Sequence, residues 1–254
     1  MKALILAAGF GTRLETGFSE YNGEYLSQVT KCVKDKPKGL VLIKGRPLVS
    51  YQLDQIKKVN VALTDVYVHT NNRFYTQYLA WARENRIPEI NVFNNGVNTN
   101  EERKGMLPDL LSAINQIGYE VPLLVFYSDT LVYDEKGLFN LQPMIDIYRS
   151  NEKSSLVIYY KERKASNHGV VTLDEQNNVL TFHEKPVGVE SGWVNASVYL
   201  FNERKLAEIK DSSSDLLKYQ NPLQLLPSQF KGVKASRRFD LGTIEDVLQI
   251  NGFN

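Results

Sequence analysis

The chain has 254 residues, 43% of them hydrophobic and 23% charged, so it is long enough to bury a core of ordinary globular size. Its formal net charge of +1 leaves no broad basic excess to follow a nucleic-acid backbone, and nucleic acid is not an expected partner. One cysteine, Cys32, and three separated histidines exclude an intrachain disulfide and argue against a cysteine- or histidine-based metal cage.

The apolar runs of the sequence are all short. The first, Lys2 to Ala8, is shorter than the apolar core of a signal peptide and much shorter than a membrane span. No later run reaches the length that a bilayer requires. We therefore expect a cytoplasmic protein without a membrane partner.

The first half of the chain alternates strand-like and helix-like segments. Lys2 to Ala8 is almost continuously apolar, as is typical of a strand buried on both faces of a parallel sheet. Further segments follow with the apolar spacing of each type: strands at 65–70, 90–93 and 121–127, and helices at 48–59, 74–85 and 108–118. This alternation predicts an α/β fold with a Rossmann-like, doubly wound, mainly parallel sheet in three α/β/α layers.

The second half of the chain is richer in strands. Short strands joined by turns are predicted at 155–160, 169–173, 179–183 and 193–201. They indicate a smaller, β-rich part with mixed pairing, inserted in or added to the first sheet. We expect a single domain over residues 1–254, with one half at 1–150 and the other at 151–254. Residues 15–36 have weak periodicity and are predicted to form a long loop or lid.

A glycine-rich turn, residues 9–14, follows the first strand. Gly9 and Gly11 have no Cβ, so backbone amides there can approach a polyphosphate, and the helix that follows adds the positive end of its dipole. Arg13 has the geometry to bind phosphate oxygens in a bidentate manner. The dinucleotide fingerprint would require a third glycine where this chain has Leu14, so an NAD-binding fold is disfavoured. A tight structural turn explains the two glycines equally well.

A lysine and two aspartates are further candidates. Lys38 follows Pro37, which would hold its charge in one place, although a solvent-facing lysine is the commoner case. Asp129 follows the apolar strand 121–127, at the edge where open α/β sheets bind ligands, and Asp240 lies in the segment FDLGT. Two carboxylates converging there would suit Mg²⁺, which prefers hard oxygen ligands and phosphate oxygens. Either aspartate alone could equally be a helix cap or a turn residue.

The segment FHEKP places Glu184 beside Lys185 at the end of a predicted strand. The carboxylate could accept hydrogen bonds from sugar hydroxyls, and the ammonium could bind a sugar phosphate. As an isolated surface ion pair the two would mean little.

Taken in order, these segments resemble the nucleotidyltransferase family of sugar-nucleotide pyrophosphorylases, the sugar-1-phosphate nucleotidyltransferases. The resemblance is carried by LAAGFGTRL, PKGL with GRPLVSYQL, SDTL, GVVTLDEQNNVLTFHEKP, VNASVYLF and FDLGT. It extends from Met1 to about Asp246. As an ordered set, these motifs are far more specific than any one of them.

The resemblance implies an enzyme that joins a nucleoside triphosphate to a sugar 1-phosphate and releases pyrophosphate, with Mg²⁺ as cofactor. The acceptor's phosphate oxygen attacks the α-phosphorus in line, so catalysis needs positioning and charge neutralisation and no protein nucleophile. Residues 1–150 would then bind the nucleotide and residues 151–254 the sugar. Because relatives often form dimers or tetramers, a second copy of the chain is a possible partner.

The resemblance also implies roles for individual residues. The catalytic residues would be Arg13, Lys38 and Asp129. The metal ligands would be Asp129 and Asp240. The nucleotide would contact Leu6, Ala7, Ala8, Gly9, Gly11, Thr12, Arg13, Lys38, Gly105 and Asp129. The sugar would contact Gly169, Glu184, Lys185 and Asn195.

Three stretches depart from the family pattern. The spacing from Leu14 to Pro37 is around twice the usual one, which makes 15–36 an insertion beside the nucleotide that forms a lid or a subunit contact. Residues 98–109 replace a small-residue stretch near the base, so the choice of base is open. Ser197 stands where glycine is usual and His168 where tyrosine is common, so the sugar pocket is expected to be unusual.

Two alternatives remain open. One is a cytidylyltransferase that acts on a non-sugar phosphate such as phosphocholine, because those enzymes share the amino-terminal motifs. Residues 184–186 and 194–199 favour a sugar acceptor instead. The other is a non-catalytic regulatory relative that binds a nucleotide or nucleotide sugar. The presence of Arg13, Lys38 and both aspartates favours an enzyme.

Overall fold

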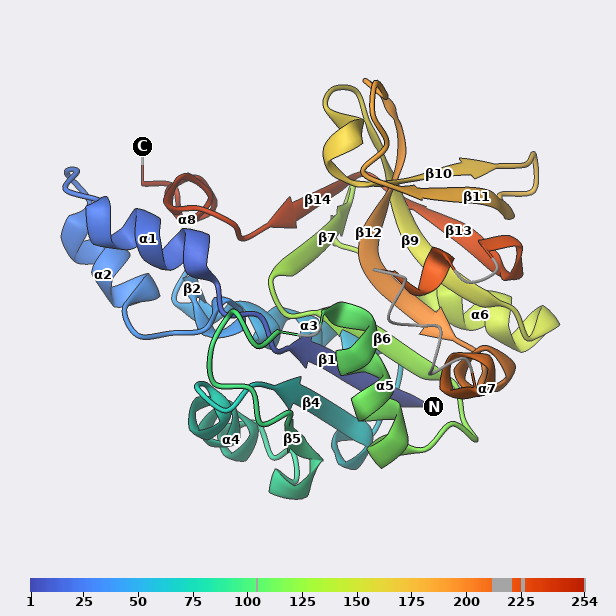
Figure 1. Cartoon of the computed structure of the whole chain (residues 1–254), viewed down its shortest axis with the longest axis horizontal. Coiled ribbons are helices and arrows are strands. Elements are labelled where there is room, and N and C mark those ends of the chain that lie inside the picture. The colour runs from blue at the N-terminus through green and yellow to red at the C-terminus, as the bar shows by residue number, and fades with distance from the viewer. Residues whose placement is uncertain (104, 212–220, 225–226, 254) are drawn as a thin grey trace.

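The computed structural model describes residues 1–103, 105–211, 221–224 and 227–253. Within these residues, a nine-stranded mixed sheet runs through the molecule (Figure 1). Its main path runs in the order β11 (Val179–Glu184), β10 (Gly169–Leu173), β12 (Gly192–Phe201), β6 (Leu123–Tyr127), β1 (Lys2–Ala7), β4 (Val66–Thr70) and β5 (Val92–Asn94). Off this path, β9 (Ser154–Lys161) pairs with β12, and β13 (Phe230–Ala235) pairs with β9.

The amino-terminal strands form the parallel part of this sheet. β1 pairs in parallel with β4 and β6, and β4 pairs in parallel with β5. Helices make the crossovers that parallel strands require: α3 (Leu48–Lys58), α4 (Tyr75–Glu84) and α5 (Met106–Ile117). β12 then continues the sheet antiparallel to β6. The register places Leu6 of β1 beside His69 and Tyr127, so these three side chains share one face.

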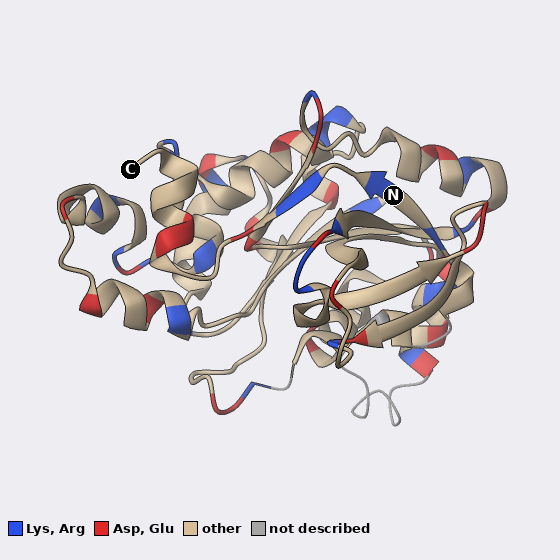
Figure 2. Ribbon diagram, turned by 90° about the horizontal axis from the view of Figure 1, so that it is seen from above, with Lys and Arg blue, Asp and Glu red and all other residues tan. Residues whose placement is uncertain are grey.

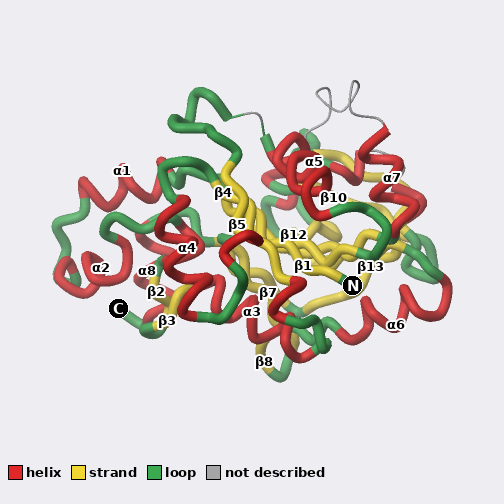
Figure 3. Tube along the Cα trace, turned by 90° about the horizontal axis from the view of Figure 1, so that it is seen from below, coloured by secondary structure: helices red, strands yellow, loops and turns green. Residues whose placement is uncertain are grey.

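Both faces of the sheet are covered by helices (Figure 3). Ala3 and Ile5 of β1 lie in one core cluster with side chains of α3, α4 and α6 (Gln142–Asn151). Leu4 and Leu6 lie in a second cluster with side chains of α5 and α7 (Glu203–Asp211). This burial on alternate faces explains the continuous apolar run of the first strand. The expected three-layer α/β fold with a mixed, mainly parallel sheet is therefore confirmed.

Two small sheets complete the described fold. One joins β14 (Arg237–Asp240), β7 (Thr130–Asp134) and β8 (Gly137–Leu138), and the other joins β2 (Leu42–Ile43) and β3 (Arg46–Pro47). The pairing of β14 with β7 matters most for the site. It places Asp240 opposite Thr130 and so returns the end of the chain to the end of β6.

The prediction of a long loop at 15–36 is wrong. This stretch lies within α1 (Thr12–Glu20), α2 (Leu26–Val33) and their connections, and both helices contact α8 (Ile244–Asn251). A core cluster joins Leu14, Val29 and Val33 to Ile244 and Val247. Short helices draw most of their stability from such packing. The partner lies about 200 residues away along the chain, so local periodicity gave little sign of it.

Charged residues of both signs are spread over the ribbon, and neither sign gathers on one side (Figure 2). In the part of the chain that the structure describes, no helix is long and apolar enough to cross a bilayer.

Candidate active site

The glycine-rich turn connects the carboxyl end of β1 to α1. Gly11 has a left-handed backbone, with φ at 71°, and precedes the first residue of the helix. A Cβ at Gly11 would lie 3.2 Å from Cγ of Lys38, so the turn and the lysine approach each other closely. No side chain caps the first turn of α1, where Thr12 and Arg13 are exposed. Its backbone N–H groups are therefore available to an anion.

Lys38 begins a short 3₁₀ turn, Lys38–Leu40, of which Gly39 and Leu40 are buried. A Cβ on the next residue, Gly39, would lie 2.5 Å from Oη of Tyr78 and 2.9 Å from Cβ of Ser128, so only glycine fits there. Nζ of Lys38 donates to Oδ2 of Asp129 at 3.0 Å, and the two side chains are 16% and 32% exposed. The expected fixed cation is thus in place, paired with the expected metal ligand.

The two aspartates meet although they are far apart in sequence. Because β14 lies beside β7, the amide of Leu241 donates to the carbonyl oxygen of Asp129 at 2.9 Å. Thr130 lies between the carboxylates: its Oγ1 donates to Oδ1 of Asp240 at 3.0 Å and lies 3.4 Å from Oδ1 of Asp129. The structure therefore brings together the pair that the sequence indicated.

These carboxylates suit a divalent cation that arrives with its substrate. They offer hard oxygen ligands, which Mg²⁺ prefers. Among the described residues, no group of three or more histidine, cysteine or acidic side chains is placed to hold a metal ion. An ion held by Asp129 and Asp240 would therefore take its remaining ligands from phosphate oxygens and water, as Mg²⁺ commonly does.

A cleft of about 660 Å³ opens beside this cluster. The predicted nucleotide-binding residues that line it are Leu6, Ala8, Gly9, Gly11, Lys38 and Asp129. The lining residues that sequence reasoning missed are Arg103, Met106, Asp109, Tyr127 and Ser128. Of the other predicted residues, Ala7 is buried, Thr12 and Arg13 face solvent, and Gly105 precedes the first residue of α5. The nucleotide roles of all these residues stay predictions.

A buried histidine lies beneath the cleft. His69 is fully buried on β4, and neither ring nitrogen has a hydrogen-bond partner among the described residues. Burial lowers the pKa of His69 to about 4, so the imidazole is neutral near pH 7. Its Nδ1 lies 3.9 Å from Oδ1 of Asp109, which lines the cleft.

Three of the four predicted sugar-binding residues lie at or next to the pairing of β10 with β11. Gly169 is opposite Glu184, and a Cβ on Gly169 would lie 2.5 Å from the ring of Phe182, so glycine is required there. Burial raises the pKa of Glu184. Lys185 is exposed with a left-handed backbone, φ 48°, and its amide donates to the carbonyl oxygen of His168 at 3.1 Å.

The fourth predicted sugar residue, Asn195, is buried at an irregularity in β12. The register between β12 and β9 shifts between Asn195 and Tyr199, and Ser197 inside this bulge has φ at 60°. Oδ1 of Asn195 accepts the amide N–H of Ser197 at 2.8 Å, and Nδ2 donates to the hydroxyl of Tyr199. The left-handed backbone explains why glycine would suit position 197. The amide of Asn195 therefore stabilises the bulge, and its contact with a sugar stays a prediction.

Arg238 is the most prominent residue that the sequence interpretation missed. Its guanidinium donates from Nε to Oδ1 of Asp240 at 2.9 Å and from Nη1 to the carbonyl oxygen of Asn195 at 2.9 Å. It thus links the metal-ligand candidate to β12. Strand alternation places Arg238 on the same face as Asp240, because residues two apart on a strand share a face, but gives no sign of its contact with Asn195.

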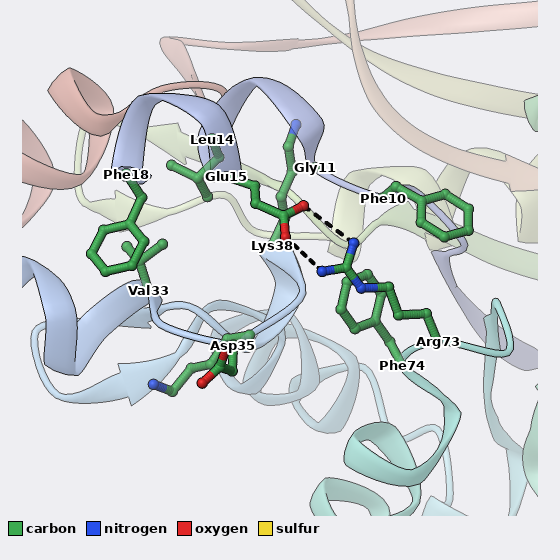
Figure 4. A pocket seen from close by; sticks show the side chains of 11 residues that line it. Phe10, Gly11, Leu14, Glu15, Phe18, Val33, Asp35, Lys38, Arg73 and Phe74 are labelled. Atoms are coloured by element: carbon green, nitrogen blue, oxygen red, sulfur yellow. Dashed lines mark hydrogen bonds and ion pairs between the residues drawn. The ribbon is translucent and has the colours of Figure 1, made fainter. Parts of the chain in front are cut away.

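A second pocket is lined by residues of α1 and the end of α2 together with Lys38, Arg73 and Phe74 (Figure 4). Gly11 and Lys38 line both cavities. Figure 4 shows Arg73 paired with Glu15 of α1, in two hydrogen bonds of 2.6 and 3.2 Å. The inserted helices therefore form a wall behind the glycine-rich turn, in place of the predicted loop.

The chain is 29% identical over 202 residues to the bifunctional sugar-1-phosphate nucleotidylyltransferase/acetyltransferase of Sulfurisphaera tokodaii, covering 80% of this chain and 41% of that protein. It is 26% identical over 230 residues to the mannose-1-phosphate guanylyltransferase catalytic subunit beta of Dictyostelium discoideum, covering 90% and 57%. The chain thus spans about half the length of these relatives.

Solved structures share the fold. A putative glucose-1-phosphate thymidylyltransferase from Bacillus anthracis matches with a TM-score of 0.73 at 16% identity, over 100% of this chain and 94% of that one. HddC from Yersinia pseudotuberculosis matches with a TM-score of 0.63 at 20% identity, over 100% and 99%.

The family model described as nucleotidyl transferase matches residues 22–253. The glycine-rich turn lies before this range, so its assignment depends on geometry and on the sequence resemblance. The match itself includes Lys38, both aspartates and the strands of the second half. The chain therefore belongs to the nucleotidyl transferase family.

Proposed function

We propose that this protein is a sugar-1-phosphate nucleotidyltransferase. It would join a nucleoside triphosphate to a sugar 1-phosphate and release pyrophosphate, with Mg²⁺ as cofactor. The observation that carries this proposal is the meeting of Lys38, Asp129 and Asp240 beside the 660 Å³ cleft. A glycine-rich turn and a helix N-terminus border the same place.

The chain's own groups suit this reaction because it requires positioning and charge neutralisation. The acceptor's phosphate oxygen would attack the α-phosphorus in line, and pyrophosphate would leave. Lys38 and Arg13 supply positive charge, and the first turn of α1 supplies backbone donors. When bound by Asp129 and Asp240, Mg²⁺ supplies further positive charge against the phosphate oxygens.

The acceptor would lie against residues of the second half. Phe182 packs so closely against Gly169 that only glycine fits there, and Glu184 stands opposite Gly169, where it could accept hydrogen bonds from hydroxyls. Lys185, exposed at the end of β11, is available to the acceptor's phosphate. These features support residues 1–150 as the nucleotide-binding half and residues 151–254 as the sugar-binding half. They also favour a sugar over phosphocholine.

The proposal is tested by measuring pyrophosphate release with Mg²⁺. Four nucleoside triphosphates would be combined with a panel of sugar 1-phosphates and with phosphocholine. We expect turnover with at least one nucleotide and sugar pair, and none when Mg²⁺ is chelated. Turnover with phosphocholine alone would establish the cytidylyltransferase alternative. Nucleotide binding without turnover for any pair would contradict an enzymatic function.

A further inference from the structure

Arg238 lies largely covered between the two parts of the candidate site. Its side chain is only 13% exposed, and it lies on β14 two residues before Asp240, on the same face of the strand. Nε donates to Oδ1 of Asp240 at 2.9 Å, and Nη2 donates to the same oxygen. Nη1 donates to the carbonyl oxygen of Asn195 at 2.9 Å. One guanidinium therefore connects β14 to β12.

This arrangement treats the two oxygens of Asp240 differently. Oδ1 accepts two N–H groups of Arg238 and the hydroxyl of Thr130, which lies 3.0 Å away. Oδ2 accepts no hydrogen bond from any described residue. These hydrogen bonds fix the rotation of the Asp240 carboxylate. Oδ1 is bonded within the protein, and Oδ2 is available to an incoming ligand.

The partner of the other aspartate is of a different kind. Asp129 is paired with Lys38, whose ammonium is a compact charge on a flexible chain. A guanidinium is a planar fork with fixed donor directions, so it sets the orientation of the carboxylate that it binds. Arg238 also offsets the repulsion between two neighbouring carboxylates.

We propose that Arg238 is a positioning residue that holds Asp240 in the orientation needed to bind a divalent cation. The proposal rests on the function proposed above, because it assumes that Asp240 binds the metal that accompanies the nucleotide. Outer partners of metal ligands typically change metal affinity about 10–100-fold when they are removed. Arg238 itself would contact neither the metal nor the reacting phosphates.

The main competing role for Arg238 is direct contact with the acceptor's phosphate. A contact of that kind would change the KM for the acceptor and leave metal affinity alone. Metal binding measured without turnover separates the two roles.

The test is Mn²⁺ binding to the full chain, titrated in turn with each of the four nucleoside triphosphates and measured by the water-proton relaxation rate, which distinguishes Mn²⁺ on the protein from Mn²⁺ on free nucleotide. We expect Arg238→Met to weaken Mn²⁺ binding about 10–100-fold, and Arg238→Lys to recover part of that loss. The matched control is Arg237→Met. Arg237 is exposed on the opposite face of β14 and lies over the ring of Tyr133, so its loss should leave Mn²⁺ affinity unchanged.

Several results would overturn the proposal. Unchanged Mn²⁺ affinity in Arg238→Met would overturn it. A higher KM for the acceptor in the same variant would then favour direct contact with the acceptor's phosphate. Equal weakening by Arg237→Met would point to a general charge effect, and wild-type protein that binds no Mn²⁺ would remove the premise. If circular dichroism shows that Arg238→Met does not fold, Arg238→Lys provides the test instead, because lysine retains the charge but lacks the planar guanidinium. Unchanged Mn²⁺ affinity in Arg238→Lys would then overturn the proposal. If Mn²⁺ affinity depends on Arg238 as expected but the wild-type protein has no turnover, this proposal stands and only the proposed function is contradicted.

Discussion

The two sides of the candidate site are constructed in different ways. On the proposed nucleotide side, Gly11 and Asp129 follow the parallel strands β1 and β6, and Lys38 begins a 3₁₀ turn after α2. On the proposed acceptor side, the backbone is irregular, with left-handed residues at Ser197 within β12 and at Lys185 just after β11. A polyphosphate can be bound by backbone donors and a few charges, whereas a sugar requires a wall of defined shape. We therefore expect changes on the first side to affect chemistry, and changes on the second to affect acceptor selection and stability.

The largest expected effect is on the nucleotide side. Asp129→Asn removes the charge that pairs with Lys38 and that would bind the metal. We expect turnover to fall about 10²–10³-fold, as for the loss of one transition-state-stabilising group, with an unchanged circular dichroism spectrum. Pyrophosphate release measures this loss. Asp54→Asn, which breaks only an exposed ion pair with Arg46, should have near-normal turnover. Near-normal turnover of Asp129→Asn would contradict its role.

The buried histidine beneath the cleft should make stability depend on pH. Because the folded pKa of His69 is about 4 and its ordinary value is 6.5, between these values the unfolded chain binds a proton that the folded chain does not. Stability should therefore fall as the pH is lowered from 6.5 to 4, by about 3 kcal/mol for this residue. Urea unfolding of the wild type and of His69→Leu over this range measures the difference.

His168 is the acceptor-side counterpart of His69. Burial also lowers its pKa to about 4, with Arg238 the next cause, but His168 is only partly buried. His168→Asn should therefore remove less of the pH dependence than His69→Leu does. Equal slopes in the wild type and His69→Leu would show that the imidazole of His69 is not desolvated as the structure indicates.

On the acceptor side, Lys185→Ala should impair use of the sugar phosphate. Loss of a charge-assisted contact at this exposed position should raise the KM for the acceptor about tenfold. Nucleotide affinity should not change. Lys164→Ala is a matched control, because Lys164 is also exposed and left-handed, with φ at 56° against 48° for Lys185. A collapse of nucleotide affinity in Lys185→Ala would mean that the two sides are assigned the wrong way round.

The smallest expected effect is a gain in stability. Ser197→Gly should relieve the left-handed strain of the β12 bulge and raise the free energy of unfolding by up to about 1 kcal/mol. Ser155→Gly, in the regular part of β9, should instead lower it. Thermal unfolding of both variants provides the comparison. A loss of stability in Ser197→Gly would show that its side chain contributes more than its backbone costs.

What could be predicted from the sequence follows the same division. β1 and β6 are buried on both faces, so their continuous apolar runs identify them as strands in the sequence. The position of Asp129 directly after β6 is enough to make it a candidate site residue. The bounds of α3, α4 and α5 also agree with the predicted helices to within two residues. These features depend on local pattern alone.

The features that were missed depend on contacts distant in sequence. α1 and α2 are helical because α8 covers their apolar residues, and that contact leaves little trace in residues 15–36 themselves. Thr130 and Arg238 gain their importance only when β14 returns to β7. The local sequence around Arg238 gives its face of the strand but not the carbonyl oxygen of Asn195 that it meets.

Because the single thiol of the chain lies in this packing, its reactivity can be used to detect local opening of these helices. Cys32 is 7% exposed in the cluster that joins α2 to α8, and burial raises its pKa. A thiol reagent would therefore react only during the brief intervals when these helices separate. The rate of labelling would measure the free energy of that local opening. Slower labelling in the presence of a nucleotide would report, without any turnover, that a ligand at Gly11 and Lys38 holds α1 and its neighbours closed.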